Sequence, residues 1–166
     1  MAGQTHHIAQ LNVGRLLEPL DSRRLAGFVA ALDPINALAD SSPGFVWRLQ
    51  DEAGDATSFR PFDDEMILVN MSVWESLDAL AAFVYRGAHT DVMRRRREWF
   101  EHLKEAYTAL WWVPAGELPT VAEARIRLEH LRRRGPSGFA FGFKRPFPPP
   151  GGKAAPTVDG AWLCPA

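Results

Sequence analysis

The stretch MILVNMSVWES, residues 66–76, decides the fold because it shows where a strand ends and a helix begins. The side chains of residues 66–74 alternate between two faces, as they do in a β-strand. One face is wholly apolar and contains Ile67, Val69, Met71 and Val73. The other face mixes apolar and polar side chains and contains Met66, Leu68, Asn70, Ser72 and Trp74. Ser76 is a favourable N-cap, so a helix is expected to begin directly after the strand.

Similar patterns on both sides of this stretch predict three more strands and the helices that connect them. The further strands are expected at residues 6–13, 45–50 and 108–113. The first connection is expected to hold a helix that is capped by Asp21 and restarts at Asp33-Pro34. The connection after Ser76 is expected to end in a long helix over residues 90–105. The order βαββαβ predicts an α+β domain with a ferredoxin-like antiparallel sheet, helices on one face and extra helices around it.

The part of the chain after the fourth strand adds one helix and a tail. Thr120 and Glu123 form a capping box, which predicts a helix that ends at Gly135. Residues 138–143 are compatible with a fifth strand, and from residue 146 onward the chain is rich in Pro and Gly. The sequence thus predicts one domain at 1–145 and a tail at 146–166. Trp162 and Cys164 are apolar residues in that tail, which is therefore expected to dock on its own or a partner protomer.

The composition limits the classes of function. The chain has 166 residues and a formal net charge of -1, which disfavours a dedicated nucleic-acid-binding protein. Cys164 is the only cysteine, so neither an internal disulfide nor a cysteine-based zinc site is expected. No apolar run approaches the ~18 residues of a membrane span, and residues 1–7 do not resemble a signal peptide. These features predict a cytoplasmic protein without a membrane or metal partner.

The mixed face of the sheet is the first indication of function. Gln10 and Asn12 of the first strand and Asn70 and Ser72 of the third are expected on this face of the two central strands. Such a wall is too apolar for open water and too polar for a dry core, but it suits a small-molecule pocket. The pocket is expected either between the sheet and the helices or between the sheets of two protomers. Alternatively, Asn12 and Asn70 only bond to each other.

The strand-to-helix stretch also carries a resemblance. Residues 69–76, with the following helix and residues 87–89, resemble the dimeric α/β-barrel superfamily. The chain is most similar to an uncharacterised bacterial family related to antibiotic-biosynthesis and heme-degrading monooxygenases, over residues 8–134. The shared pattern is a strand, then Trp, Glu and Ser, a short helix and His, here Trp74, Glu75, Ser76 and His89. This resemblance implies a homodimer built as a dimeric α/β barrel.

The resemblance implies two kinds of chemistry. In heme-degrading relatives the site contains an Asn on the first strand, which Asn12 matches, and an aromatic residue, which Phe83 or Trp74 matches. Met93 stands where those relatives carry an axial His one helical turn after His89, so the heme pattern is incomplete. Cofactor-free relatives oxidise polyketide-like aromatics and use Asn, Trp and Arg groups to polarise a phenol.

The helix after His89 supplies candidate charged groups. Helical spacing places Met93 and Arg96 on the same stripe as His89, whereas the other arginines of the run 94–97 fall on different sides. Arg96 is therefore expected to face the cavity and orient an anion. His89 is expected to transfer a proton, because a histidine whose pKa is near neutral pH can act as an acid or a base. Alternatively, His89 only bonds to the backbone at the start of the helix.

Two tryptophans are adjacent on the last strand. The rings of Trp111 and Trp112 must point to opposite faces of the sheet. Trp112 shares its alternation with the mixed face, so it is expected to form the cavity wall together with Trp74.

An RNA-binding domain is the competing interpretation of the strand order. Residues 138–143, GFAFGF, imitate the aromatic signature of the RNA recognition motif, which has the same order of elements. They follow the last core strand, whereas that signature belongs on the third strand. The third strand here lacks a pair of stacking aromatics, which favours a small-molecule ligand over RNA.

Together these features predict a homodimer with monooxygenase-like or isomerase-like activity on an aromatic or polyketide-like substrate, without a cofactor. The expected catalytic residues are His89, Asn70, Asn12 and Arg96. The expected substrate-binding residues are Trp74, Trp112, Gln10, Ser72, Met93 and Phe83. The alternatives are a heme-binding or heme-degrading protein and a non-catalytic dimeric binding module.

Overall fold

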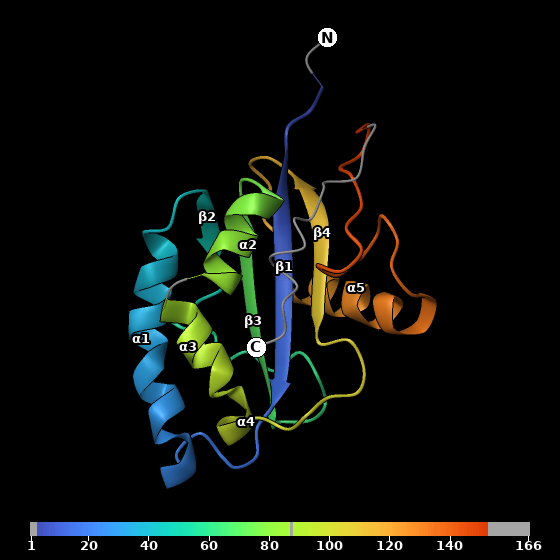
Figure 1. Cartoon of the computed structure of the whole chain (residues 1–166). Coiled ribbons are helices and arrows are strands. Elements are labelled where there is room, and N and C mark those ends of the chain that lie inside the picture. Colours follow the sequence, from blue (N-terminus) through green and yellow to red (C-terminus); the bar gives the residue numbers. More distant parts are fainter. Residues whose placement is uncertain (1–2, 87, 153–166) are drawn as a thin grey trace.

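A four-stranded antiparallel sheet forms the centre of the molecule. The computed structural model describes residues 3–86 and 88–152, without the side chains of residues 88 and 89 (Figure 1). The strands are β1 (His6–Arg15), β2 (Phe45–Arg48), β3 (Ile67–Trp74) and β4 (Thr108–Pro114). Their order in the sheet is β2-β3-β1-β4. This order, with helical connections after β1 and β3, confirms the ferredoxin-like α+β fold.

The register of the sheet brings the predicted polar residues together. β1 pairs with β3 so that Gln10 lies opposite Ser72 and Asn12 lies opposite Asn70. Because side chains alternate along a strand, all four residues belong to one face of the two central strands. Ile8 and Trp74 are also opposite each other and continue this mixed face toward the far end of the sheet.

Two helical layers cover the two faces of the sheet (Figure 1). The connection after β1 holds η1 (Arg23–Leu25) and α1 (Ala26–Asp40), and the connection after β3 holds α2 (Leu77–Tyr85), α3 (Ala88–Arg94) and α4 (Arg96–Trp99). Buried residues of η1, α2 and α4 pack with the mixed face. The last helix, α5 (Val121–Arg134), packs with the wholly apolar face through Ala124, Leu128 and Leu131.

This arrangement corrects the predicted assignment of the faces. The apolar face was expected to meet the helices that connect the strands, but α5 and side chains from Leu49 to Phe62 cover it instead. The mixed face meets α1 to α4, so the prediction of a partner sheet on that face is wrong. Alternation along a strand shows which side chains share a face, but it does not show which layer covers that face. The homodimer itself stays a prediction.

The helices differ from their predicted bounds in two places. α1 runs continuously through Pro34, so the predicted restart at Asp33-Pro34 is wrong, and its N-cap is Leu25 rather than Asp21. The expected long helix over residues 90–105 is wrong: α3 ends at Arg94, α4 ends at Trp99, and the chain then becomes extended. Phe100 forms an isolated β-bridge with Leu16, a long-range contact that helical spacing does not reveal.

Capping residues behave as the sequence predicts. The Ser76 side chain accepts a hydrogen bond from the Ala79 backbone N–H at the start of α2. The Thr120 side chain accepts one from the Glu123 backbone N–H at the start of α5. Gly135 ends α5 with a φ of 77°, a value that favours glycine.

The segment after α5 lies along the outer edge of β4. The expected fifth strand at residues 138–143 is wrong, because only Phe141 pairs with the sheet, through a single bridge to Leu110. The backbone oxygen of Phe147 accepts a hydrogen bond from Trp112 Nε1 at 2.8 Å. The predicted docking of Trp162 and Cys164 lies outside the described residues. Within the described chain, no helix has the length and apolar character needed to cross a membrane.

Candidate functional site

A cavity of about 320 Å³ lies between the mixed face of the sheet and helices α1 to α4. Ligand pockets typically have volumes of ~300–1,000 Å³ and mostly apolar walls with a few polar groups. The floor is formed by side chains of β1 and β3, namely Gln10, Asn12, Asn70, Ser72 and Trp74. Side chains of the four helices form the opposite wall, among them Phe28, Ile35, Phe83, Met93 and Arg96. Of the two predicted locations for the pocket, the structure therefore places this cavity inside one protomer.

Arg96 is held in the cavity wall by hydrogen bonds and ring contacts. Its Nη2 donates to the backbone oxygen of Val13 at 3.0 Å, and its Nη1 lies 3.4 Å from Oδ1 of Asn12. The guanidinium carbon is 5.1 Å from the ring centre of Phe100 and 4.8 Å from that of Tyr107. Among the residues that the structure describes, no carboxylate forms an ion pair with Arg96. The cavity therefore contains a cation whose charge is not balanced by the described protein.

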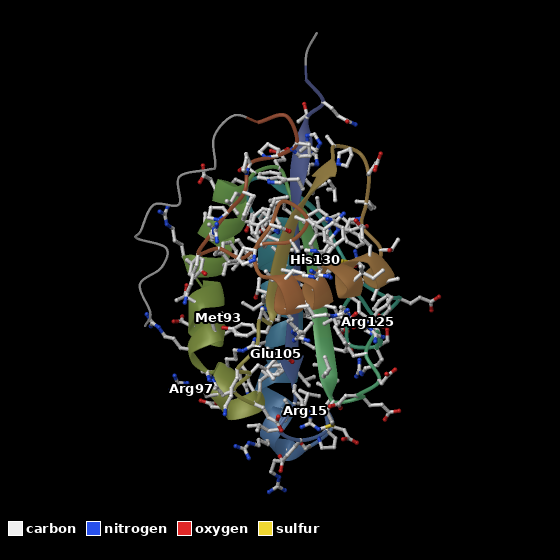
Figure 2. All side chains as sticks on the ribbon, turned by 90° about the vertical axis from the view of Figure 1, so that its right-hand side faces the viewer. Arg15, Met93, Arg97, Glu105, Arg125 and His130 are labelled. Atoms are coloured by element: carbon white, nitrogen blue, oxygen red, sulfur yellow. The ribbon has the colours of Figure 1, made fainter. Side chains whose placement is uncertain are left out.

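The remaining arginines of the run 94–97 face away from the cavity. Arg94 is exposed, and its Nη1 lies 3.6 Å from Oδ1 of Asp91. Arg95 forms an ion pair with Glu98, with 3.0 Å between Nη2 and Oε2. Arg97 is exposed and lies at the periphery of the molecule (Figure 2). Although the predicted long helix is broken at residue 95, the first turn of α4 still turns Arg96 toward the sheet.

Arg48 is a second arginine in the cavity lining, and its environment is different. Its Nε donates to Oδ1 of Asp40 at 2.7 Å, and its Nη1 donates to the backbone oxygen of Gly54 at 2.6 Å. The Asp40 carboxylate balances the charge of Arg48. Because Arg96 has no such partner among the described residues, Arg96 is the better candidate to bind an anionic ligand.

Burial changes the acid–base properties of the cavity wall. Burial lowers the pKa of Arg96, and the nearby Tyr107 opposes this change. An arginine keeps its proton even so, because its ordinary pKa lies far above neutral pH. Burial raises the pKa of Tyr85, and Tyr107 adds to the increase. At neutral pH the cavity thus presents a guanidinium cation at Arg96 and the un-ionised phenol of Tyr85, which is a hydrogen-bond donor rather than a base.

The polar floor of the cavity contains two separate hydrogen-bonded groups. Ser72 Oγ accepts from Gln10 Nε2 at 3.1 Å and from Trp74 Nε1 at 2.9 Å. Asn12 Nδ2 donates to Thr108 Oγ1 at 2.9 Å. Asn70 is exposed and its side chain has no hydrogen bond to another described residue, so the side chains of Asn12 and Asn70 do not bond to each other as the alternative interpretation required.

Gly14 of β1 is required where the cavity wall approaches the strand. A Cβ atom at this position would lie 2.6 Å from Cδ1 of Phe100 and 3.2 Å from Nη2 of Arg96. We expect Gly14→Ala to lower the free energy of unfolding by about 1–3 kcal/mol, since overpacking displaces the buried ring. Urea denaturation measures this change. Gly138→Ala is the matched control, with open space around its Cβ and an expected change within about 0.5 kcal/mol; equal values for both variants would contradict the prediction.

The structure separates the predicted site residues into three groups. Those that line the cavity are Asn12, Asn70, Arg96, Trp74, Gln10, Ser72, Met93 and Phe83. Trp112 does not line it: the prediction of a cavity wall is wrong, because the β4 edge directs this ring toward Phe141 and Phe147. His89 lies on α3, but its side chain is outside the described part of the structure, so its role stays a prediction.

Sequence reasoning missed Tyr107, Thr108 and Tyr85. Tyr107 and Thr108 lie where the chain enters β4, and the pairing of Thr108 with Asn12 brings both to the cavity. The position of these two residues at the cavity depends on the long-range pairing of β4 with β1. Tyr85 ends α2, and its ring contacts Phe143 with centres 5.4 Å apart. The only local signal for Tyr107 and Thr108 as site residues is that a tyrosine stands next to a threonine at the start of β4.

The heme alternative gains no support from the described lining. None of the described side chains in the cavity belongs to His or Cys, whereas Met93, Tyr85 and Tyr107 are present. The described residues also contain no cluster of three or more His, Cys, Asp or Glu side chains that could hold a metal ion. Titration with heme, followed by the Soret band, tests this alternative directly.

Comparison with solved structures finds similar folds at low identity. A variant of SnoaB, a cofactor-independent oxygenase from Streptomyces nogalater, matches with a TM-score of 0.43 and 15% identity over 68% of this chain and 95% of that chain. A protein of unknown function from Nitrosomonas europaea scores 0.42, with 14% identity over 71% of this chain and 99% of that one. A putative antibiotic biosynthesis monooxygenase from Chloroflexus aurantiacus J-10-fl scores 0.40, with 15% identity over 69% of this chain and 98% of that one.

Comparison with curated proteins finds no significant match. A family model described as a domain of unknown function, DUF3291, matches residues 7–157. This match covers the sheet except for His6, every helix of the described residues and the cavity between them. The chain therefore belongs to the DUF3291 family.

Proposed function

We propose that the cavity binds a small aromatic or polyketide-like molecule through an acidic oxygen and transforms it by proton removal, in the manner of a monooxygenase or an isomerase. The observation that carries the proposal is the position of Arg96 in the cavity without a carboxylate partner among the described residues. Arg96 is half-buried, and removing a cation from water is unfavourable unless the cation is paired. A carboxylate, phenolate or enolate of a ligand supplies the missing charge.

The residues around Arg96 suit an oxygen anion on a flat molecule. Arg96 offers several N–H donors in one plane, so it binds such an oxygen through charge-assisted hydrogen bonds. The rings of Trp74 and Phe83 stack with centres 5.0 Å apart and an angle of 27°, and they form an apolar side of the cavity. A planar ligand can lie along these rings while its charged oxygen reaches Arg96.

The same arrangement favours chemistry next to that oxygen. A cation beside a phenol or ketone stabilises the phenolate or enolate that forms when a proton leaves. In the proposal His89 moves that proton, and Asn12 and Asn70 polarise a carbonyl or bound oxygen. Return of the proton to another carbon completes an isomerisation. In the oxygenase version the carbanion gives electrons to dioxygen, a CH₂ group becomes C=O, and the second oxygen atom leaves as water.

Binding of benzoate against benzamide tests the role of charge. These two ligands share a ring and nearly the same shape, but only benzoate carries an anionic oxygen at neutral pH. We expect benzoate to bind about ten times more tightly or better, since a hydrogen bond to a charged group contributes ~1.5–3 kcal/mol. Isothermal titration calorimetry measures both dissociation constants. Equal affinity for the two ligands, or binding of neither, contradicts an anion site at Arg96.

Mass spectrometry of the purified and then denatured protein gives a second, independent check. We expect a small aromatic or enolic acid to co-purify with the protein. Incubation of that molecule with the protein and dioxygen, without added cofactor, then distinguishes oxygenase, isomerase and binding activity by the mass of the product. An added oxygen atom indicates oxygenation, and an unchanged mass with a changed spectrum indicates isomerisation.

A further inference from the structure

We infer that Ser72 is a second recognition point, whose hydroxyl donates a hydrogen bond to a carbonyl or ether oxygen of the ligand. The inference rests on the proposed function and adds a requirement to it: the ligand carries an anionic oxygen and, across one ring, an uncharged acceptor oxygen. The inference is based on three observations: the hydrogen bonds of Ser72, its position in the sheet register, and its hydrogen bond to the aromatic wall formed by Trp74 and Phe83.

The hydrogen bonds of Ser72 leave one proton without an acceptor. A serine hydroxyl has two acceptor lone pairs and one O–H donor. Both lone pairs are used, by Gln10 Nε2 at 3.1 Å and by Trp74 Nε1 at 2.9 Å. The residues that the structure describes include no acceptor for the Ser72 proton. Because Ser72 is only 6% exposed and lines the cavity, its proton can be satisfied by an oxygen inside that cavity.

The sheet register fixes how far this donor lies from the cation. Gln10 is opposite Ser72 and Asn12 is opposite Asn70, so Asn12 and Ser72 are diagonal neighbours on one face. Diagonal neighbours in an antiparallel pair are about 7–8 Å apart. Arg96 Nη1 lies 3.4 Å from Oδ1 of Asn12, at the other end of that diagonal. A ligand that reaches both points therefore carries its two oxygens at opposite ends of about one benzene ring.

The aromatic wall is tied to the same hydroxyl. The indole N–H of Trp74 donates to Ser72, and the ring of Trp74 stacks on Phe83. The bond to Ser72 thus helps to fix the indole ring beside the hydroxyl. Ring stacking and hydrogen bonding to the ligand act at one place, which makes the pair of Ser72 and Trp74 suited to recognise an aromatic ketone.

Two ligands of similar size test the inference, 4-acetylbenzoate and 4-isopropylbenzoate. Both carry a carboxylate for Arg96, but only the acetyl group has an acceptor oxygen at the opposite end of the ring. We expect Ser72→Ala to weaken the binding of 4-acetylbenzoate about tenfold, the effect of one lost hydrogen bond. The affinity for 4-isopropylbenzoate is expected to stay the same within a factor of about two. Isothermal titration calorimetry measures all four dissociation constants.

The isopropyl ligand is the control for changes in folding, because it reports the state of the cavity in the same variant. Ser72→Thr, which keeps the hydroxyl, is expected to restore the preference for the acetyl ligand even if both affinities fall. Equal losses for both ligands in Ser72→Ala, or no loss for either, would show that Ser72 is only structural and would overturn the inference. If benzoate binds but neither substituted ligand does, the spacing is wrong while the proposed anion site stands. If benzoate also fails to bind, the proposed function itself fails.

Discussion

Arg96→Met is expected to weaken benzoate binding by roughly 10- to 100-fold while leaving benzamide binding unchanged. Methionine keeps an unbranched side chain of similar length but removes the charge and the N–H donors. The ligand carboxylate would then lose its charge-assisted hydrogen bonds to the guanidinium group. Calorimetric titration of both ligands into both proteins gives the ratio of the benzoate and benzamide dissociation constants for each protein. A general change in the cavity alters both constants alike, so it does not change this ratio.

Arg97→Met is the matched control for this change. Arg97 is the next residue of α4, is exposed and has no hydrogen bond or ion pair to another described residue. Its replacement removes the same charge from the same helix, so the change in net charge is equal in the two variants. We expect Arg97→Met to change benzoate affinity by less than a factor of two. An equal loss in both variants would mean that net charge, and not the position of Arg96, attracts the anion.

The stability of Arg96→Met distinguishes a ligand-binding arginine from a structural one. The substitution removes the bond from Arg96 to the backbone oxygen of Val13, but it also removes a half-buried charge without a carboxylate partner among the described residues. These effects oppose each other. We expect the midpoint of thermal unfolding to move by less than about 4 °C, which corresponds to ~1 kcal/mol for a chain of this size. A much larger fall would show that Arg96 mainly holds β1 to α4.

Much of the sheet and part of the site follow from local sequence patterns. Alternation along residues 66–74 correctly gives the mixed face with Asn70 and Ser72, because period-2 geometry is a property of a single strand. Arg96 also faces the cavity as its spacing predicts, since one helical turn is enough to orient it. These features depend on neighbours in the sequence, so they can be predicted without knowledge of the rest of the molecule.

The remaining errors come from contacts between distant segments. The helix at 90–105 ends early because Phe100 pairs with Leu16, and no local pattern indicates that bridge. The mixed face is covered by α1 to α4 because α5 takes the apolar face, a choice between layers that depends on all the connections together. Tyr107 reaches the cavity through the pairing of β4 with β1. Register and layer order are properties of the whole fold, so single-strand patterns cannot supply them.

The two adjacent tryptophans of β4 provide the largest expected effect on stability. Trp111 is fully buried, and its ring packs in the cluster formed by the apolar face of the sheet and by α5 residues such as Leu128. The guanidinium carbon of Arg127 lies 5.5 Å from the ring centre. We expect Trp111→Ala to lower the free energy of unfolding by about 3–5 kcal/mol, because it leaves a large cavity between the sheet and α5. Urea denaturation followed by circular dichroism measures this loss.

Trp112→Ala is the natural comparison, because the same change is made one residue away on the opposite face. Trp112 is only half-buried, and it bonds to Phe147 through its indole N–H. It therefore loses less apolar burial, and we expect a cost of about 1–3 kcal/mol. Neither ring lines the cavity, so both variants are expected to keep the benzoate affinity of the unmodified protein when they are folded. A loss of benzoate affinity in Trp112→Ala alone would return this residue to the cavity wall, where the alternation of the strand first suggested it. Similar stability losses in the two variants would instead show that the segment after α5 supports β4 as strongly as α5 itself does.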